Sequence, residues 1–235
     1  MNKTHYRFFL FCATFAGAIA LFADFLIGFS YPDPIGRYGM VQTSWAYIAS
    51  WRPILSMILA SIVFPLYFPG LYVISKRIEK TAPIAARVFR VSSYVASFGC
   101  LLVHAAFCMP LYIYKYLYDA GYKILAINTA DRILDIAVPS LALTGIAMFI
   151  AFSTFFVIII RGKTIYSRWS CLFNPIIITL ITICLDHFLP SSKLINGISM
   201  CKMNLGLFLF FVIAIIHEYT CKDNWETVAK RPNEL

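Results

Sequence analysis

The sequence predicts an all-α integral membrane protein, a bundle of six transmembrane helices with both termini in the cytoplasm. Hydrophobic residues make up 60% of the 235 residues and charged residues 13%, whereas soluble domains carry about 25% charged residues. Several apolar runs also approach the roughly 20 residues that a helix needs to cross a bilayer. These observations exclude an ordinary soluble domain.

Six apolar segments are predicted to span the membrane, and no repeat or linker divides residues 1–235. The predicted spans are residues 8–29, 53–74, 88–112, 133–160, 169–189 and 203–219. The first is longer than the roughly 7–15 apolar residues of a signal peptide, so we expect a retained span. Lys and Arg are more frequent in the loops on the side of the N-terminus. This bias predicts cytoplasmic termini, and we expect a bacterial inner membrane.

The net charge of +9 has a simple explanation in that loop bias, so no nucleic-acid partner is predicted. The seven cysteines form no Cys-x-x-Cys motif, and the four histidines have no metal-ligand spacing. No metal or other cofactor is therefore expected. His217 and Glu218 close the last span and are interpreted as polar residues of a helix end.

Aromatic residues mark the predicted outer side of the membrane. After the turn residues 31–39, Val41, Trp45 and Ile48 recur at helical spacing and Trp51 follows. This pattern indicates a short helix in the membrane interface, where Trp and Tyr rings are favoured. It would serve as an anchor or as a lid over a pocket. The tyrosines of residues 112–122 are interpreted as part of the same aromatic belt.

Small and polar residues recur on one face of several spans, which predicts the faces that contact other helices. In the first span this face carries Ala13, Gly17, Ala20, Asp24 and Gly28, and in the third it carries Ser93, Ser97, Cys100, His104 and Cys108. The other spans contribute Arg52, Ser56 and Ala60, then Asp131, Asp135, Pro139, Ala142 and Gly145, and finally Thr179, Thr182 and Asp186.

The depths of the charged residues place them in the outer half of the bundle. At 1.5 Å per residue, Asp24 lies about 7 Å below the outer end of its span and His104 about 16 Å below the headgroups. Asp135 and Asp186 lie within about one turn of the outer surface. Because charge at such depth normally faces a protein interior, we expect a polar cavity that opens outward. Arg52 at its mouth would pair with Asp24 or Asp135.

An aspartate near a histidine in a partly dry cavity suits acid–base catalysis. We therefore assign catalytic roles to Asp24, His104 and Asp135. Substrate-binding roles are assigned to a second set of residues, namely Arg52, Trp45, Trp51, Thr182 and Asp186. Structural alternatives stay open, because Asp131 and Asp135 would also suit helix capping. An Asp24–Arg52 ion pair would equally suit a purely structural role.

The start of the fifth span reads Trp169-x4-Asn174-Pro175, and Pro65 and Pro69 interrupt the second span at a similar inner depth. Such breaks would be packing irregularities or a cytoplasmic gate. The Trp-x4-Asn-Pro sequence, together with the aspartate late in the first span, resembles small multi-pass bacterial membrane proteins of uncharacterised function. That resemblance implies no activity.

Three functions fit these features. The first is a membrane enzyme that performs acid–base chemistry on a lipid-like or isoprenoid substrate. The second is a non-catalytic carrier or receptor that binds a small amphiphile in the same cavity. The third is a structural or sensor protein whose buried charges only fix helix register. A membrane lipid or another amphiphile is the expected partner, and the sequence does not define an oligomeric state.

Overall fold

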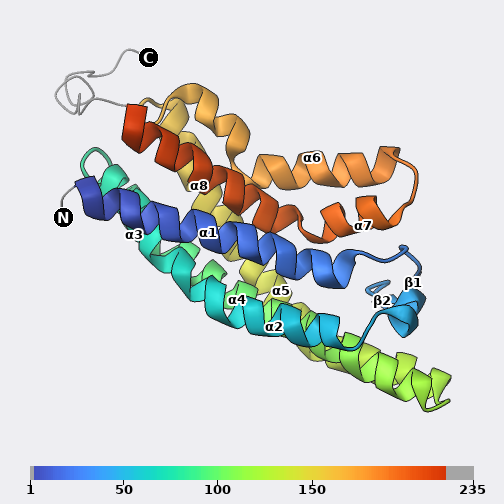
Figure 1. Ribbon diagram of the computed structural model, residues 1–235. Helices are drawn as coiled ribbons and strands as arrows, with labels where there is room; N and C mark the ends of the chain where they lie inside the picture. The colour runs from blue at the N-terminus through green and yellow to red at the C-terminus, as the bar shows by residue number, and fades with distance from the viewer. Residues whose placement is uncertain (1–2, 221–235) are drawn as a thin grey trace.

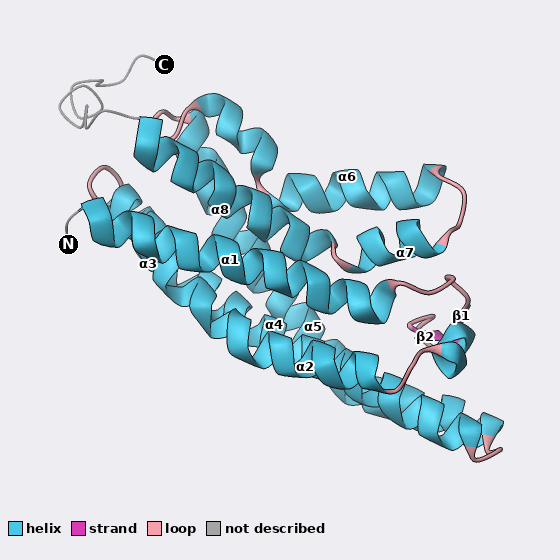
Figure 2. Ribbon diagram, in the orientation of Figure 1, coloured by secondary structure: helices cyan, strands magenta, loops and turns pink. Residues whose placement is uncertain are grey.

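The computed structural model describes residues 3–220, which are almost entirely helical (Figures 1 and 2). Within this part of the chain, five helical segments are long and apolar enough to cross a membrane. They are α1 (Lys3–Gly28), the α2–α3 rod (Trp51–Glu79), α4 (Pro83–Asp119), α5 (Lys123–Ile160) and α8 (Lys202–Thr220). The predicted all-α class is therefore confirmed, and five segments have the length and composition of membrane spans. The C-terminal tail that we assigned to the cytoplasm lies outside the described residues.

The second predicted span is one rod made of two helices. A 3-10 turn, η2 (Phe64–Leu66), joins α2 (Trp51–Val63) to α3 (Tyr67–Glu79). The expected break at Pro65 is thus present, because proline lacks the amide hydrogen that an α-helix needs there. Past the break, Gly70 packs so closely on α1 that a Cβ atom would collide with the side chain of Ala13.

The predicted third and fourth spans are much shorter than the helices observed. With 37 and 38 residues, α4 and α5 are each about 55 Å long, whereas the hydrocarbon layer is about 30 Å thick. They continue past the apolar core as a helical hairpin that turns at Gly121, whose φ is +90°. Hydropathy does not detect this extension. The extension instead depends on small residues such as Ala126 and Ala130, which are fully buried where α4 and α5 pack together.

The predicted fifth span, residues 169–189, is not one continuous helix. It divides into a 3-10 helix, η3 (Arg168–Phe173), and α6 (Pro175–Phe188). Asn174 separates them, accepting a hydrogen bond from Ile176 N and donating one to Phe152 O over 2.8 Å. With 14 residues, α6 is about 21 Å long. A sixth span is therefore not confirmed. A short helix, α7 (Lys193–Met200), leads from α6 to α8.

The loop between α1 and α2 folds over the α4–α5 hairpin (Figure 1). It forms a two-stranded sheet, β1 (Pro34–Ile35) with β2 (Val41–Gln42), and a 3-10 helix, η1 (Thr43–Tyr47), in the stretch where we predicted a short interfacial helix. Trp45 of η1 is only 2% exposed and packs edge-on against Tyr114 with ring centroids 6.1 Å apart. The ring therefore anchors the loop on the hairpin, and its position relative to the membrane interface stays a prediction.

Candidate functional site

A buried aspartate and a buried histidine meet inside the bundle. Asp24 comes from α1 and His104 from α4, and Oδ1 of Asp24 lies 3.1 Å from Nδ1 of His104. Their exposed fractions are 8% and 6%. The two side chains that the sequence assigns to inward faces are therefore in contact. Ionisable groups at such positions are costly unless a neighbour compensates them, which each residue does for the other.

The second ring nitrogen of His104 faces a serine of α2. Ser56 Oγ lies 2.9 Å from Nε2, and it lies 2.7 Å from the carbonyl oxygen of Ala23 in α1. Ser56 is fully buried. The sequence placed Ser56 on an inward face without giving it a role, because serine is also a common small packing residue between membrane helices.

The second carboxylate oxygen of Asp24 is bound by a residue of α8. Asn204 Nδ2 donates to Asp24 Oδ2 over 2.7 Å, and the Tyr67 hydroxyl of α3 donates to Asn204 Oδ1 over 3.1 Å. We missed both residues in the sequence. An amide near the start of an apolar span was a usable signal for Asn204. Tyr67 carried none, since it is one of 14 tyrosines.

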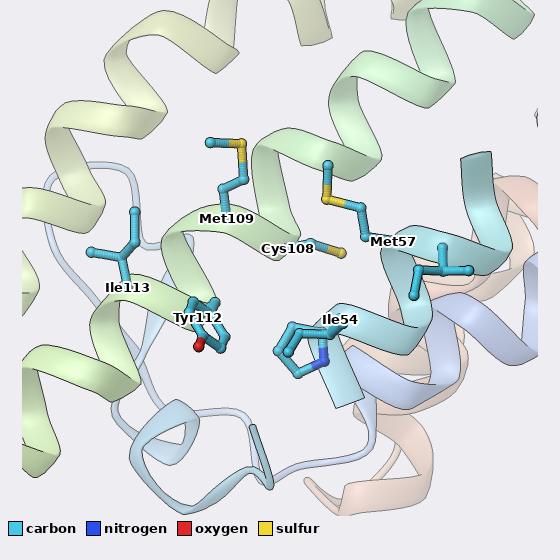
Figure 3. A pocket seen from close by; sticks show the side chains of 8 residues that line it. Ile54, Met57, Cys108, Met109, Tyr112 and Ile113 are labelled. Carbon is cyan, nitrogen blue, oxygen red and sulfur yellow. The ribbon is translucent and has the colours of Figure 1, made fainter. Parts of the chain in front are cut away.

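A cavity of about 320 Å³ adjoins this network between α2 and α4 (Figure 3). Its lining is apolar and consists of Pro53, Ile54, Met57, Ile58, Cys108, Met109, Tyr112 and Ile113. Cys108 connects the cavity to the polar network, because it lines the cavity and its Sγ lies 3.8 Å from Ser56 Oγ. The buried polar groups thus contact one another directly, and the neighbouring space is suited to hydrocarbon.

Arg52 does not pair with Asp24 or Asp135, so that prediction is wrong. Its guanidinium donates to the carbonyl oxygens of Leu26 and Phe29, the latter over 3.0 Å. These carbonyls lie at the C-terminal end of α1, where the last groups lack helical partners and the helix dipole favours a cation. Arg52 therefore ties α2 to the end of α1.

Asp135 makes no contact with the Asp24–His104 pair and instead binds the loop between α1 and α2. It accepts a hydrogen bond from the Tyr38 hydroxyl over 2.7 Å and forms a 3.0 Å ion pair with Arg37. Asp131 accepts from the Arg37 amide over 3.0 Å. Neither aspartate caps a helix, as we had considered, because α5 begins earlier, at Lys123. The pKa of Arg37 is raised by its hydrogen bond with Tyr38 and by the charge of Asp135.

The polar residues of α6 make local contacts. Thr182 is buried and donates to Ile178 O over 2.8 Å, while Asp186 accepts from Ser199 of α7 over 3.0 Å. These contacts tie α6 to itself and to α7, away from the groups that bind Asp24. Across residues 3–220, no group of three or more His, Cys, Asp or Glu side chains is arranged to hold a metal ion.

A second buried ionic contact lies near the ends of α3 and α8. Arg77 Nε donates to Glu218 Oε1 over 2.6 Å, and the two side chains are 4% and 2% exposed. Glu218 thus lies in the last turn of α8, as predicted, but it is buried against a cation of α3, which the sequence did not indicate. His217, its neighbour, lies 2.7 Å from Ser170 Oγ through Nε2.

Comparison with known proteins identifies one family. The model of a family of unknown function, DUF6796, matches residues 1–220. No curated protein and no solved structure matches the chain.

Proposed function

We propose that this protein, which belongs to the DUF6796 family of unknown function, is an integral membrane enzyme that performs acid–base chemistry on a lipid-like substrate. The observation that carries the proposal is the buried Asp24–His104 contact beside an apolar cavity. Ionisable side chains inside a membrane bundle are expensive to retain and commonly mark a working site.

In this proposal His104 exchanges a proton with the substrate through Nε2. Asp24 acts as a positioning residue, because its carboxylate accepts from Nδ1 and holds the ring with Nε2 toward α2. Asn204 holds the carboxylate in turn. The apolar surroundings lower the local dielectric constant, which strengthens the electrostatic contact between carboxylate and imidazole.

The cavity between α2 and α4 supports the choice of substrate. Ile54, Ile58, Met109 and Tyr112 line it and are also exposed on the outside of the bundle. An apolar chain could therefore enter sideways from the bilayer. We propose that its polar end lies toward the outer end of α2, where Trp51 is 56% exposed and Arg52 is half-buried.

We further propose six membrane crossings with both termini in the cytoplasm of a bacterial cell. The beginning of α1 and the end of α8 lie at the same end of the bundle (Figure 1), which an even number of crossings requires. η3 and α6 together would make the short fifth crossing. Reporter fusions test this. A phosphatase inserted at Gly121 should be active outside the cell, and a fluorescent protein at the C-terminus should fold inside it.

A carrier or receptor for a small amphiphile is the second candidate. It is favoured by one observation, namely that the cavity is lined by apolar residues while Asp24 and His104 are buried behind them. Such a protein would bind its ligand and release it unchanged.

Lipid analysis separates the two candidates. Purified protein in nanodiscs is incubated with a total bacterial lipid extract, and lipids are quantified by mass spectrometry over time. We expect a lipid class to be consumed by the wild type and not by Asp24→Asn or His104→Gln. The matched controls Asp119→Asn and His187→Gln replace the same residue types at exposed positions and should retain turnover. A lipid that co-purifies unchanged, with no consumption by the wild type, would favour the carrier instead.

A further inference from the structure

Ser56, His104 and Asp24 form a continuous chain of hydroxyl, imidazole and carboxylate. The oxygen–nitrogen distance is 2.9 Å on one side of the ring and 3.1 Å on the other. A serine activated by a base must lie within about 2.6–3.2 Å of it, with a third group orienting the base. This constellation is defined by geometry and recurs on unrelated folds. Three different helices supply it here, α2, α4 and α1.

We infer that Ser56 is a nucleophile and that the substrate is a carboxylic ester of an amphiphile. The inference rests on the proposed function, because it uses His104 as the base and the α2–α4 cavity as the binding site. It adds a catalytic residue, a substrate class and a covalent intermediate.

The Ser56 hydroxyl has one hydrogen and two acceptors within reach, Ala23 O at 2.7 Å and His104 Nε2 at 2.9 Å. When the hydrogen points to Ala23, the hydroxyl is held between α1 and α2 and Ser56 is at rest. When it points to Nε2, the oxygen gains a base that can remove the proton as a bond forms. Nε2 also lies 3.3 Å from the Ser56 carbonyl oxygen, so the ring is held against this residue of α2.

The apolar cavity reaches the nucleophile at Cys108. Ser56 itself is fully buried, and the Cys108 thiol lies 3.8 Å from its oxygen while also lining the cavity. In Figure 3 Cys108 and Tyr112 of α4 point toward Ile54 and Met57 of α2. Met57 is unbranched and adaptable, so its movement would open the short path from the cavity to Ser56.

The reaction balances with water as the second reactant. Ser56 Oγ bonds to the ester carbonyl carbon and its proton passes to His104 Nε2. The carbon–alkoxy bond then breaks, and the leaving oxygen takes that proton. Water next attacks the acyl-serine, giving a proton to Nε2, and the acyl–Oγ bond breaks as Ser56 recovers a proton. The products are a carboxylic acid and an alcohol, and no redox partner is needed.

A long-chain alkyl fluorophosphonate tests the inference, because it bonds covalently to activated hydroxyls. Full-length protein in nanodiscs is treated with the probe, and the adduct is located by intact mass and peptide sequencing. We expect one adduct, on Ser56. It should be absent in Ser56→Ala, and it should form about a hundredfold more slowly in His104→Gln, as expected for loss of a general base. The control Ser61→Ala, at an exposed serine of the same helix, should label like the wild type.

Two results of the labelling experiment would overturn the inference. An adduct on Cys108 would make the thiol the reactive group, and an unlabelled wild type would show that Ser56 is not activated. If Ser56→Ala fails to fold, the position of the wild-type adduct still decides. Should the wild type remain unlabelled while Asp24→Asn and His104→Gln abolish lipid consumption, the nucleophile is refuted and the acid–base enzyme stands. The fluorophosphonate reports the nucleophile and the lipid assay reports turnover, so the two tests fail independently.

Discussion

Replacement of Arg77 by methionine should destabilise the protein strongly. The Arg77 guanidinium contacts the Glu218 carboxylate over 2.6 Å from Nε to Oε1, and its carbon Cζ lies 4.3 Å from the centroid of the Tyr6 ring. The side chains of the ion pair are 4% and 2% exposed. Methionine keeps much of the apolar stem of Arg77 but removes the charge. It therefore leaves the Glu218 carboxylate buried without this cation.

The expected cost follows from that burial. Breaking a buried ion pair by removing one partner costs about 3–5 kcal/mol, because the remaining charge stays desolvated. For a chain of this size, 1 kcal/mol corresponds to roughly 2–4 °C in Tm, so a fall of about 6–20 °C is expected. The assay heats detergent-solubilised protein and measures the monodisperse fraction by size-exclusion chromatography.

The neighbouring residue Lys76 provides the control. It pairs with Glu79 over 2.6 Å, but these side chains are 35% and 38% exposed. Such surface pairs contribute about 0–1 kcal/mol, so Lys76→Met should lower Tm by only a few degrees. The reasoning is refuted if Arg77→Met is no more destabilising than Lys76→Met. A double variant, Arg77→Met with Glu218→Gln, should recover part of the loss because it leaves no unpaired charge.

Two glycines allow similar tests with matched controls. Gly36→Ala should lower Tm more than Gly39→Ala. Both residues have positive φ, but only at Gly36 would a Cβ atom collide with the carboxylate of Asp131. Equal shifts would show that backbone strain alone sets the cost. Gly99→Ala should force α4 away from Thr144 of α5 and cost about 1–3 kcal/mol, as overpacking does. Gly145→Ala, which meets open space, should be neutral in the same thermal assay, and a cost equal to that of Gly99→Ala would contradict the close contact.

The sequence predicted the helical class and most of the span positions, but not the helix ends. Hydropathy marks where a helix must be apolar, and α8 is accordingly found at residues 202–220 against a prediction of 203–219. It does not mark where a helix stops. α4 continues to Asp119 because α5 packs beside it along the hairpin. Asn174 caps the start of α6 and so interrupts a span that apolar composition alone would have made continuous.

The candidate site was predicted in part for a similar reason. Helical periodicity gave the inward faces of α1 and α4, so Asp24 and His104 were expected to turn toward each other. Periodicity within one helix says nothing about the relative height of two helices. We therefore predicted that Arg52 pairs with an aspartate, whereas it binds the carbonyl groups at the end of α1. Asn204 stood out as an amide in an apolar span, but its contact with Asp24 joins residues 180 positions apart, so the partner could not be predicted from local sequence.

The shape of the polar network is our reason for proposing a working site and not a device that only fixes helix register. Its hydrogen bonds run in order through Tyr67, Asn204, Asp24, His104 and Ser56, which come from α3, α8, α1, α4 and α2. The Tyr67 end is fully buried, and in the middle of the network the Asp24 carboxylate is bound through both oxygens. At the other end Ser56 lies beside Cys108, which lines the apolar cavity. Helix register would be fixed equally well by a network enclosed on all sides. A chain that is held firmly at one end and meets a hydrocarbon-sized space at the other is suited to moving a proton at that space, which is why we favour catalysis.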